Sequence, residues 1–475
     1  MTNKIKIKQG ASAPPPLQKI FDRIFFQPYI PRILGIFFIK QGKLVFSYTN
    51  YPFCLSAALI DQDNSNRILW RSASPLWQTK ELIKPLKMSL KKQTFRLRYL
   101  KQKQVKKTEF PLEKIFKRSQ TKTRSTVFDR VAKNPILTPI SSNDWESLAV
   151  FNCAALYLAG RVHLVYRAIG ESGLSNFGYA SSSDGIRVDK RLASPIYVSN
   201  PSHENAANTP RAFSQRYQSG ANWGGYEDPR LTQIDDTIYM TYTAFDGVNP
   251  PGVALTSIRT KDFLKGNWNW RKPALISAPQ QAHKNWVIFP QKINGKFAIL
   301  HSLTPDIRID YYDDLDFQES DYIASSYQSS GRDNWWDNCM RGVGPPPLKT
   351  EQGWLVLYHA MDKKDPDRYK VGAMLLDLNE PTKIIYRSPA PLLEPDARYE
   401  NNGFKSGVVY TCGALIIGEL LYVYYGGAYT VVCAAFIKLE RLLEQLKSSR
   451  HPILNSKLKL KRQSKRAKLC LSQND

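Results

Sequence analysis

The residues best suited to chemistry lie at or near the ends of short apolar runs in the C-terminal two thirds of the chain. They comprise an acidic pair, several cations and amides, a histidine and two tyrosines: Asn152, Arg167, Glu227, Asp228, Lys284, Asn285, Arg341, His359, Tyr369 and Tyr425. Carboxylates, amides and Arg can hydrogen-bond sugar hydroxyls, aromatic rings can stack on a sugar face, and clustered cations attract anions. This mixture predicts a pocket that takes a sugar together with an anion.

Single residues of this set also have plain structural interpretations. Asp228 precedes Pro229, so it could be no more than a turn residue. His301 and His359, which end two of the apolar runs, could be hydrogen-bonded histidines of a sheet core. Taken one at a time, these residues leave both interpretations open.

The elements that must position these residues form an internal repeat. Five segments each contain an apolar run, a turn with Gly or Asp, and a second apolar run that ends on a polar residue. They span residues 154–167, 231–243, 291–301, 347–359 and 411–425, are spaced 58 to 76 residues apart, and are each followed by another short run. Alternation with a period of two dominates, which predicts an all-β fold. Five such repeats favour a five-bladed β-propeller over a series of β-sandwiches.

In a propeller, strand ends from every blade meet at a central pocket. We therefore expect the residues that end the second runs to gather there: Arg167, Thr243, His301, His359 and Tyr425.

Positive charge is concentrated outside this repeat. The 475 residues carry a formal net charge of +26, with 27 Lys and Arg against 7 Asp and Glu in residues 1–130, and 9 against 1 in residues 447–475. Apolar runs at residues 32–39 and 44–48 flank a turn with Gly42 and predict a hairpin. We divide the chain into a basic N-terminal region (1–130) with a small β-domain and a basic connector at 83–125, a propeller (131–446) and a basic tail (447–475). The basic flanks are interpreted either as solvated or as contacting RNA or another anionic surface.

Composition excludes several classes of protein. Hydrophobic residues make up 42% and charged residues 23% of the chain, which is typical of a globular protein. Six scattered cysteines indicate neither a zinc ribbon nor a disulfide framework and suit a reducing compartment. We find no uninterrupted apolar run of about 20 residues and no signal-peptide core after the early lysines. A cytoplasmic protein without a membrane span is expected.

The ordered motifs resemble glycoside hydrolase family 130, the β-mannoside phosphorylases and related hydrolases, whose fold is a five-bladed propeller. The matching motifs cover roughly residues 130–445: Asn134-Pro135-Ile136, Trp145-Glu146-Ser147, Phe151-Asn152, Tyr166-Arg167-Ala168, Glu227-Asp228-Pro229-Arg230, Lys284-Asn285, Gly342 to Pro347, Tyr358-His359 and Tyr424-Tyr425-Gly426-Gly427-Ala428.

The resemblance implies cleavage of β-mannosidic bonds with inversion, with Asp228 as proton donor. Asn152, Arg167, Glu227 and Tyr425 would then bind the sugar, while Lys284, Asn285, Arg341, His359 and Tyr369 would bind phosphate. Phosphate would be the nucleophile and co-substrate, yielding mannose 1-phosphate, and no metal or organic cofactor is implied.

Two positions depart from the family pattern. Ser302 stands where the phosphorylases usually carry Arg, and Tyr429 stands where the family has Asp. An inverting β-mannosidase that uses water is the alternative; it would need a second carboxylate as base, and Glu227, Asp306 and Asp362 are the candidates. A glycan-binding propeller without turnover is a further alternative, and a nucleic-acid-associated protein, suggested by the basic flanks, is another.

Overall fold

The structure is a computed structural model that describes the strands between residues 32 and 111 and residues 127–199, 224–318, 321–325, 331–332 and 335–448. The predicted all-β class is confirmed, because strands dominate the described residues and the helices among them are few and short. They are η1 (Asp144–Glu146), α3 (Thr260–Lys265), α4 (Arg398–Asn401) and α5 (Leu439–Ser448). No helix among the described residues is long and apolar enough to cross a membrane.

The N-terminal region contains the hairpin that was predicted. Strand β1 (Arg32–Ile39) pairs with β2 (Gly42–Asn50) in antiparallel register, and the pair belongs to a five-stranded sheet. The other strands of this sheet are β3 (Phe53–Ile60), β4 (Ile68–Arg71) and β5 (Trp77–Thr79). The residues before β1 and the basic tail beyond residue 448 lie outside the described residues.

The basic connector predicted at residues 83–125 is wrong over its first two thirds. Strands β6 (Lys84–Lys91), β7 (Thr94–Lys101) and β8 (Gln104–Pro111) form a three-stranded antiparallel sheet. Phe95, Leu97 and Tyr99 are buried on one face of β7, while Arg96 and Arg98 between them are exposed. A period of two is therefore present, but the many Lys and Arg conceal it.

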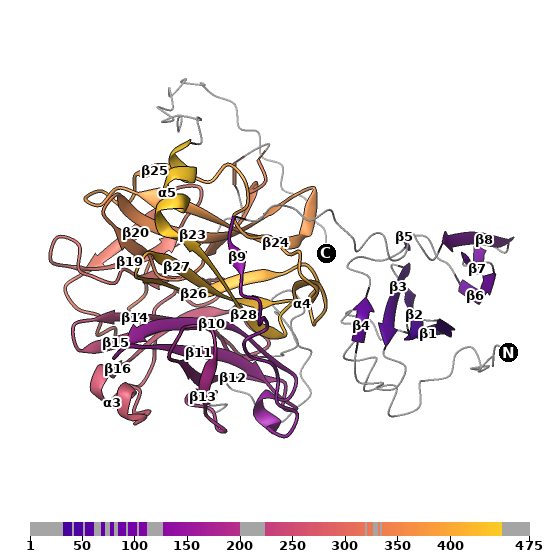
Figure 1. The fold of residues 1–475 in the computed structure, drawn as a ribbon, viewed down its shortest axis with the longest axis horizontal. Coiled ribbons are helices and arrows are strands. Elements are labelled where there is room, and N and C mark those ends of the chain that lie inside the picture. The colour runs from indigo at the N-terminus through magenta and orange to yellow at the C-terminus, as the bar shows by residue number, and fades with distance from the viewer. Residues whose placement is uncertain are drawn as a thin grey trace.

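Residues 127–448 form five sheet units that follow one another along the chain (Figure 1). Unit 1 contains β10 (Ala149–Leu158), β11 (Arg161–Ile169), β12 (Leu174–Ser182) and β13 (Val188–Arg191). Unit 2 contains β14 (Gly224–Ile234), β15 (Thr237–Phe245), β16 (Gly252–Arg259) and β17 (Ala274–Leu275). A short parallel contact joins β12 to β14, so units 1 and 2 share one continuous sheet.

Units 3 to 5 are separate sheets. Unit 3 contains β18 (Val287–Ile288), β19 (Phe297–Ser302) and β20 (Arg308–Tyr312). Unit 4 contains β21 (Cys339–Val343), β22 (Leu348–Thr350), β23 (Gly353–Asp362), β24 (Asp365–Leu376) and β25 (Ile384–Arg387). Unit 5 contains β26 (Val409–Ile417), β27 (Leu420–Gly427) and β28 (Val431–Lys438), completed by β9 (Asp129–Arg130) from before unit 1. Four of the five predicted repeat segments contain residues of two neighbouring strands of one unit, whereas the third, residues 291–301, contains residues of β19 alone.

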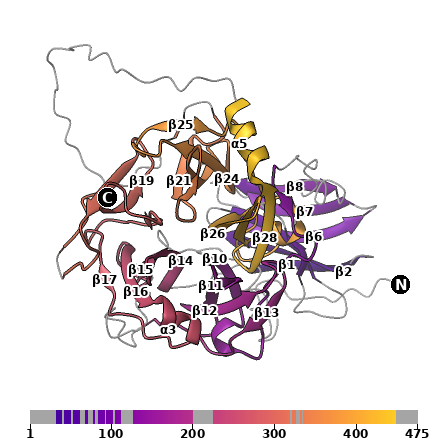
Figure 2. The same ribbon diagram turned by 60° about the vertical axis from the view of Figure 1, so that its left-hand side comes forward.

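The five units surround a common centre (Figure 2). Each unit shares a buried apolar core with the next: units 1 and 2, 2 and 3, 3 and 4, and 4 and 5. A further core packs unit 5 against unit 1. The side chains therefore complete a ring even though no single sheet closes on itself, and β9 ties the start of this region to its last unit.

Candidate active site

A β-bulge interrupts one strand in each unit, and three of the bulges carry predicted site residues. The bulges fall between Phe151 and Ala154, Glu227 and Arg230, Leu300 and Ser302, Met340 and Gly342, and Thr411 and Gly413. A bulge adds a residue to one strand and re-aims its side chain. Asn152 and Asp228 take left-handed backbone conformations at their bulges, with φ of 45° and 54°. Asn and Asp tolerate this conformation better than most other residues.

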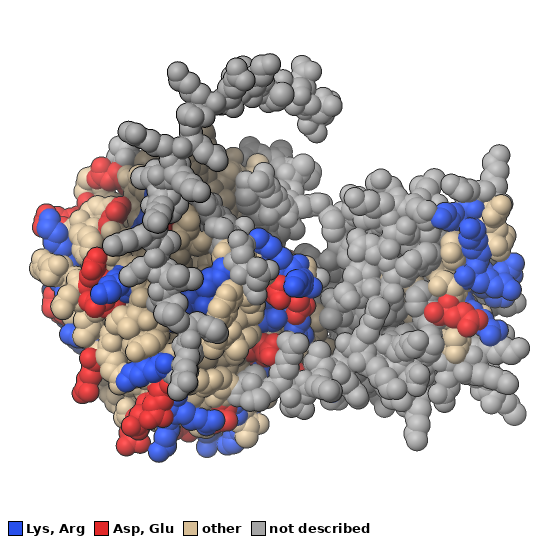
Figure 3. All heavy atoms as spheres, turned by 90° about the horizontal axis from the view of Figure 1, so that it is seen from above, with Lys and Arg blue, Asp and Glu red and all other residues tan. Residues whose placement is uncertain are grey.

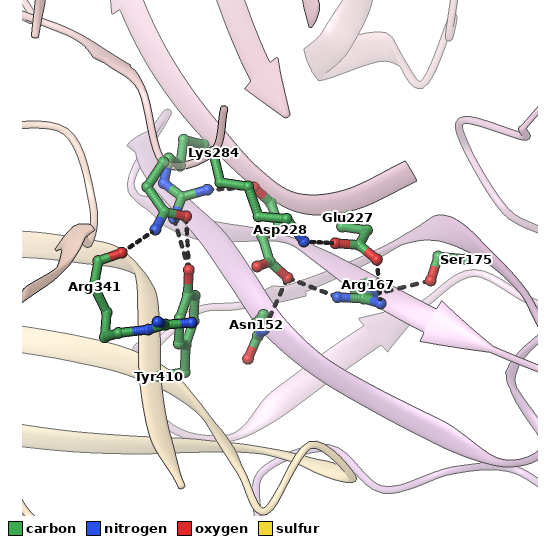
Figure 4. Close-up of polar contacts among 10 residues, drawn as sticks. Asn152, Arg167, Ser175, Glu227, Asp228, Lys284, Arg341 and Tyr410 are labelled. Carbon is green, nitrogen blue, oxygen red and sulfur yellow. Dashed lines mark hydrogen bonds and ion pairs between the residues drawn. The ribbon is translucent and has the colours of Figure 1, made fainter. Parts of the chain in front are cut away.

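The bulges of β10 and β14 bring Asn152 and Asp228 together (Figure 4). The Asn152 amide Nδ2 donates to Asp228 Oδ1 at 2.8 Å, and Arg167 Nη1 donates to the same oxygen at 3.1 Å. Asp228 is 5% exposed. Its second oxygen, Oδ2, makes no hydrogen bond to any described residue, so it is the atom available to a ligand. The buried Asn152 Oδ1 also has no partner among the described residues.

Arg167 and Lys284 bind the other carboxylate of the pair. Glu227 Oε1 accepts from Arg167 Nη2 at 3.1 Å, and Glu227 Oε2 accepts from Lys284 Nζ at 2.8 Å. The Arg167 guanidinium is held in addition by Ser175 and by the Phe151 ring, 4.7 Å from its centroid. Both oxygens of the fully buried Glu227 are thus engaged, one by the buried Arg167 and one by the partly exposed Lys284.

These cations set the charge of Asp228. Burial acts to raise the pKa of its carboxyl group, but Arg167, Arg230, the hydrogen bond from Asn152 and Lys284 together lower the pKa below its ordinary value. Asp228 is therefore ionised in the unliganded protein at neutral pH. To act as an acid it must gain a proton once ligands are bound.

Arg230 links Asp228 to the segment of Lys284 and Asn285. Its Nη1 donates to the Asp228 carbonyl oxygen at 2.7 Å, and its Nη2 donates to Asn285 Oδ1 at 2.8 Å. The Tyr410 hydroxyl donates to the same Asn285 oxygen at 2.7 Å, while Asn285 Nδ2 donates to the carbonyl oxygen of Arg341 at 2.7 Å. Asn285 thus joins Arg230, Tyr410 and the bulge of β21.

His359 lies against Tyr410, which bonds Asn285, and its imidazole ring is neutral. Burial, followed by the charges of Arg230 and Arg341, lowers its pKa well below the ordinary value. Its Nε2 accepts the Thr411 N–H at 2.9 Å, so the ring proton is on Nδ1, which is buried without a partner among the described residues. The ring stacks on Tyr410 with centroids 3.8 Å apart.

Tyr369 presents its ring to two cations. Arg341 lies 5.4 Å from the ring centroid, and the Lys405 ammonium lies 4.6 Å from it. Tyr369, Tyr410 and Tyr429 belong to one buried cluster with Phe151, which brings units 1, 4 and 5 together. Nine of the ten predicted site residues thus lie in one connected set.

The part of the sequence that contains these residues matches one family model. Residues 122–448 match the model of glycoside hydrolase family 130, which is described as β-1,4-mannooligosaccharide phosphorylase. The chain belongs to glycoside hydrolase family 130.

Curated relatives of this family 130 chain include two proteins of Thermoanaerobacter sp. strain X514. One, named 1,2-β-oligomannan phosphorylase, is 36% identical and covers 66% of this chain and 97% of its own length. The other, named β-1,2-mannobiose phosphorylase, is 35% identical over 66% of this chain and 98% of its own. A solved structure of β-1,2-mannobiose phosphorylase from Listeria innocua, bound to β-1,2-mannobiose, is similar with a TM-score of 0.51 at 27% identity, and covers 68% of this chain and 99% of that one.

Tyr425 is the tenth residue, and the structure places it away from Asp228. Its hydroxyl donates to the buried Glu400 at 2.7 Å, and Arg130 of β9 pairs with the same carboxylate at 2.7 Å. Unit 1 repeats this set with Glu146, Tyr166 and Arg191, and unit 4 repeats it with Asp337, Tyr358 and Arg387. In all three units the Tyr and the Arg occupy equivalent register positions. The predicted sugar contact of Tyr425 is therefore wrong, because this tyrosine belongs to a structural motif of the sheet.

Of the other two residues that end apolar runs, His301 lies apart from the Asp228 set, and Thr243 lies beside Glu227 but its hydroxyl makes no hydrogen bond to the described residues of the set. His301 hydrogen-bonds Ser325 at 2.8 Å and packs against Trp286, and Thr243 is buried beside Glu227 in register without a hydrogen bond for its hydroxyl among the described residues. Ser302, at the position where the family usually has Arg, donates to the Thr304 carbonyl oxygen at 3.0 Å. It brings no charge to the site.

Tyr410 and Lys405 were not predicted as site residues, and Tyr429 was predicted only as a departure from the family pattern. Tyr429 lies at the site: its ring is 5.5 Å from that of Phe151, and its backbone has φ of 51°. Tyr410 follows two valines at the start of β26, where nothing in the local pattern distinguishes it from a core tyrosine. Lys405 lies outside every apolar run, so a search of run ends could not find it.

Proposed function

We propose that this chain cleaves β-mannosidic bonds by phosphorolysis with inversion, and that it releases mannose 1-phosphate. The observation that carries the proposal is the charge of the site. Among the described residues it holds five cations and two carboxylates, so it is suited to a doubly charged phosphate. A neutral sugar and water would need no such excess of positive charge.

In this proposal Asp228 is the general acid, and its unbonded Oδ2 faces the substrate. Asn152, Arg167 and Glu227 hold the sugar, with Asn152 Oδ1 as an acceptor for a hydroxyl. Lys284, Asn285, Arg341, His359 and Tyr369 form the phosphate end, where the Nδ1 proton of His359 is a donor with no partner in the described part of the chain. Asn285 acts there chiefly by positioning Arg230 and Arg341, since its oxygen already accepts two hydrogen bonds.

Hydrolysis is the alternative, and it requires a carboxylate free to activate water. Glu227 is unsuited because Arg167 and Lys284 already bind both of its oxygens. Asp306 is exposed, and Asp362 is bonded to Asn338 and to the Lys364 N–H, so neither joins the described Asp228 set. These contacts favour phosphate as the nucleophile.

We propose that the five units are the blades of a five-bladed β-propeller, with β9 as the outer strand of the last blade. The ring of shared cores and the pairing of β9 with β28 support this. In this scheme the propeller accounts for residues from Val127 to about residue 446, and the basic region of residues 1–130 is a separate part except for β9.

The linkage that we propose is β-1,2. Three relatives named for β-1,2 substrates are 35–40% identical to this chain, whereas the Ruminococcus albus relative named for β-1,4 substrates is 30% identical.

The deciding experiment incubates the purified protein with β-1,2-mannobiose and β-1,4-mannobiose, each with and without phosphate. We expect α-mannose 1-phosphate in the ³¹P NMR spectrum, with turnover that depends on phosphate. Turnover that ignores phosphate would support the hydrolase. Sugar binding without any product would support the glycan-binding protein suggested by Ser302 and Tyr429.

We also propose that the basic N-terminal region contacts an anionic surface. Lys87, Arg98 and Lys107 are exposed and lie directly opposite one another across β6, β7 and β8, where Lys and Arg gather in Figure 3. Like charges in such a row repel, so an anionic partner would stabilise it. Binding of the whole chain to anionic vesicles and to RNA, compared with a variant that has Gln at these three positions, tests the idea; equal binding by both proteins would refute it.

A cytoplasmic location is proposed on the cysteines. Cys153, Cys339, Cys412 and Cys433 are all unpaired, as expected in a reducing compartment. Fractionation of the source cells tests this; recovery of the protein outside the cytoplasm would refute it.

A further inference from the structure

Lys405 is a cation at the edge of the candidate site, and neither the family motifs nor the sequence pattern assign it a role. Its ammonium lies 4.6 Å from the centroid of the Tyr369 ring and 5.9 Å from that of Tyr429. Aromatic faces attract cations without neutralising them. Among the described residues, Lys405 forms no ion pair with a carboxylate.

The position of Lys405 is determined by its backbone. Its N–H donates to the Ala428 carbonyl oxygen at 3.0 Å, and the preceding Phe404 N–H donates to Thr430 Oγ1 at 2.9 Å. Two residues later, the Gly407 carbonyl oxygen accepts the Tyr369 N–H at 2.9 Å. The segment is therefore attached to both chain regions that supply its aromatic partners. A substitution of the Lys405 side chain leaves these hydrogen bonds in place.

Lys405 also lies close to the residues proposed to bind phosphate. Arg341 is 5.4 Å from the centroid of the same Tyr369 ring, so the two positive groups are no farther apart than the sum of the two distances, 10 Å. Three of the other cations are already bound to groups of the protein: Lys284 and Arg167 bind Glu227, and Arg230 donates to carbonyl oxygens.

We propose that Lys405 binds the anionic co-substrate, an inorganic phosphate or the phosphate group of the sugar phosphate product, and that Tyr369 and Tyr429 hold its ammonium ready for this contact. The inference rests on the proposed phosphorolysis. It adds a phosphate-binding residue supplied by the loop that joins α4 to β26.

The test uses the full chain and four proteins: wild type, Lys405→Met, Lys405→Arg and Lys296→Met. Methionine keeps an unbranched side chain over the two rings and removes the charge, whereas arginine keeps the charge. Lys296 is the matched control, since it pairs with Asp313 at 3.1 Å on the surface of unit 3. The readouts are the binding of inorganic phosphate by calorimetry, and KM for phosphate, KM for mannobiose and kcat.

We expect Lys405→Met to weaken phosphate binding and to raise KM for phosphate by about tenfold to a hundredfold, the usual effect of one charge-assisted hydrogen bond. KM for mannobiose should stay within about twofold, and Lys405→Arg should recover most of the loss. Lys296→Met should match wild type. A merely structural role for Lys405 would instead change both KM values or the melting temperature.

The failure of this inference differs from the failure of the proposed function. Wild-type phosphorolysis with an unchanged KM for phosphate in Lys405→Met would overturn the role of Lys405 and leave the function standing. Absence of phosphorolysis would refute the function, and calorimetry would still decide on Lys405: equal phosphate binding by wild type and Lys405→Met, or none by either, overturns the inference.

Discussion

The change Asp228→Asn tests the role proposed for this residue as the general acid. The amide oxygen of the new side chain can still accept the hydrogen bonds from Asn152 Nδ2 and Arg167 Nη1, which both reach the same oxygen, Oδ1. What is lost is the ionisable group. A positioned general acid contributes about 10²–10⁴ to the rate, so we expect kcat to fall by about 10²–10⁴. The carboxylate is 5% exposed, which leaves bulk water poorly placed to substitute for it.

The affinity for phosphate should respond differently from kcat. The substitution removes a negative charge beside Arg167, Arg230 and Lys284, so phosphate should bind as tightly as in wild type or more tightly. The assay is phosphate-dependent release of mannose 1-phosphate under saturating substrate, together with calorimetric phosphate binding and a thermal melt to confirm folding. Asp306→Asn, at an exposed carboxylate, is the control and should keep full activity. Near-wild-type turnover by Asp228→Asn would remove this residue from the mechanism and return it to a structural role in its bulge.

Three further predictions concern the support of the site. In Gly426→Ala the added carbon would lie 2.2 Å from Asn152 Oδ1 and 2.9 Å from the Asn152 backbone nitrogen, so Asn152 must move. We expect kcat/KM to fall about tenfold to a hundredfold together with a lower melting temperature, and unchanged kinetics would contradict the role of Asn152. Arg130→Met leaves the buried Glu400 without its cation and should lower the free energy of unfolding in urea by about 3–5 kcal/mol. Arg161→Met, at a surface pair with Asp189, should lower it by about 0–1 kcal/mol. Equal losses in the two variants would refute a role of β9 in closing the ring. Cations hold the pKa of Asp228 below its ordinary value, and the negative charge of bound phosphate would raise that pKa again. The basic limb of the pH–rate profile should therefore lie at higher pH with saturating phosphate than with limiting phosphate. Coincident profiles would rule out this coupling between phosphate and Asp228.

Sequence patterns predicted the hairpins of residues 127–448 well because buried two-residue alternation is visible in the chain. The pairs β10–β11 and β26–β27 fall on their predicted repeat segments. The same alternation in β7 went unnoticed, because Arg96 and Arg98 share that strand with its three buried residues. A high density of charge therefore conceals a strand whose other face is apolar.

The site was predicted more by residue type than by position. Arg167 and His359 do end apolar runs and do join the site, but Tyr425 ends an equivalent run and binds Glu400 instead. The difference depends on which face of the strand each residue occupies and on the bulges of the neighbouring strands. Neither can be obtained from run ends alone. An Asn or Asp next to a buried run, as at Asn152 and Asp228, was the available signal for a bulge with positive φ.

The charge of the site and the proton of Asp228 are parts of one arrangement. Without ligands, the surrounding cations keep Asp228 ionised, and an ionised carboxylate cannot donate a proton. A doubly charged phosphate entering among Lys284, Arg341 and their neighbours would offset that excess and raise the pKa of Asp228. The nucleophile would thereby help to protonate the acid that its own attack requires. A site in which water is the nucleophile would lack this increase in the pKa of Asp228 on binding of the nucleophile. It would also need a second free carboxylate as base, which the described residues around Asp228 do not provide.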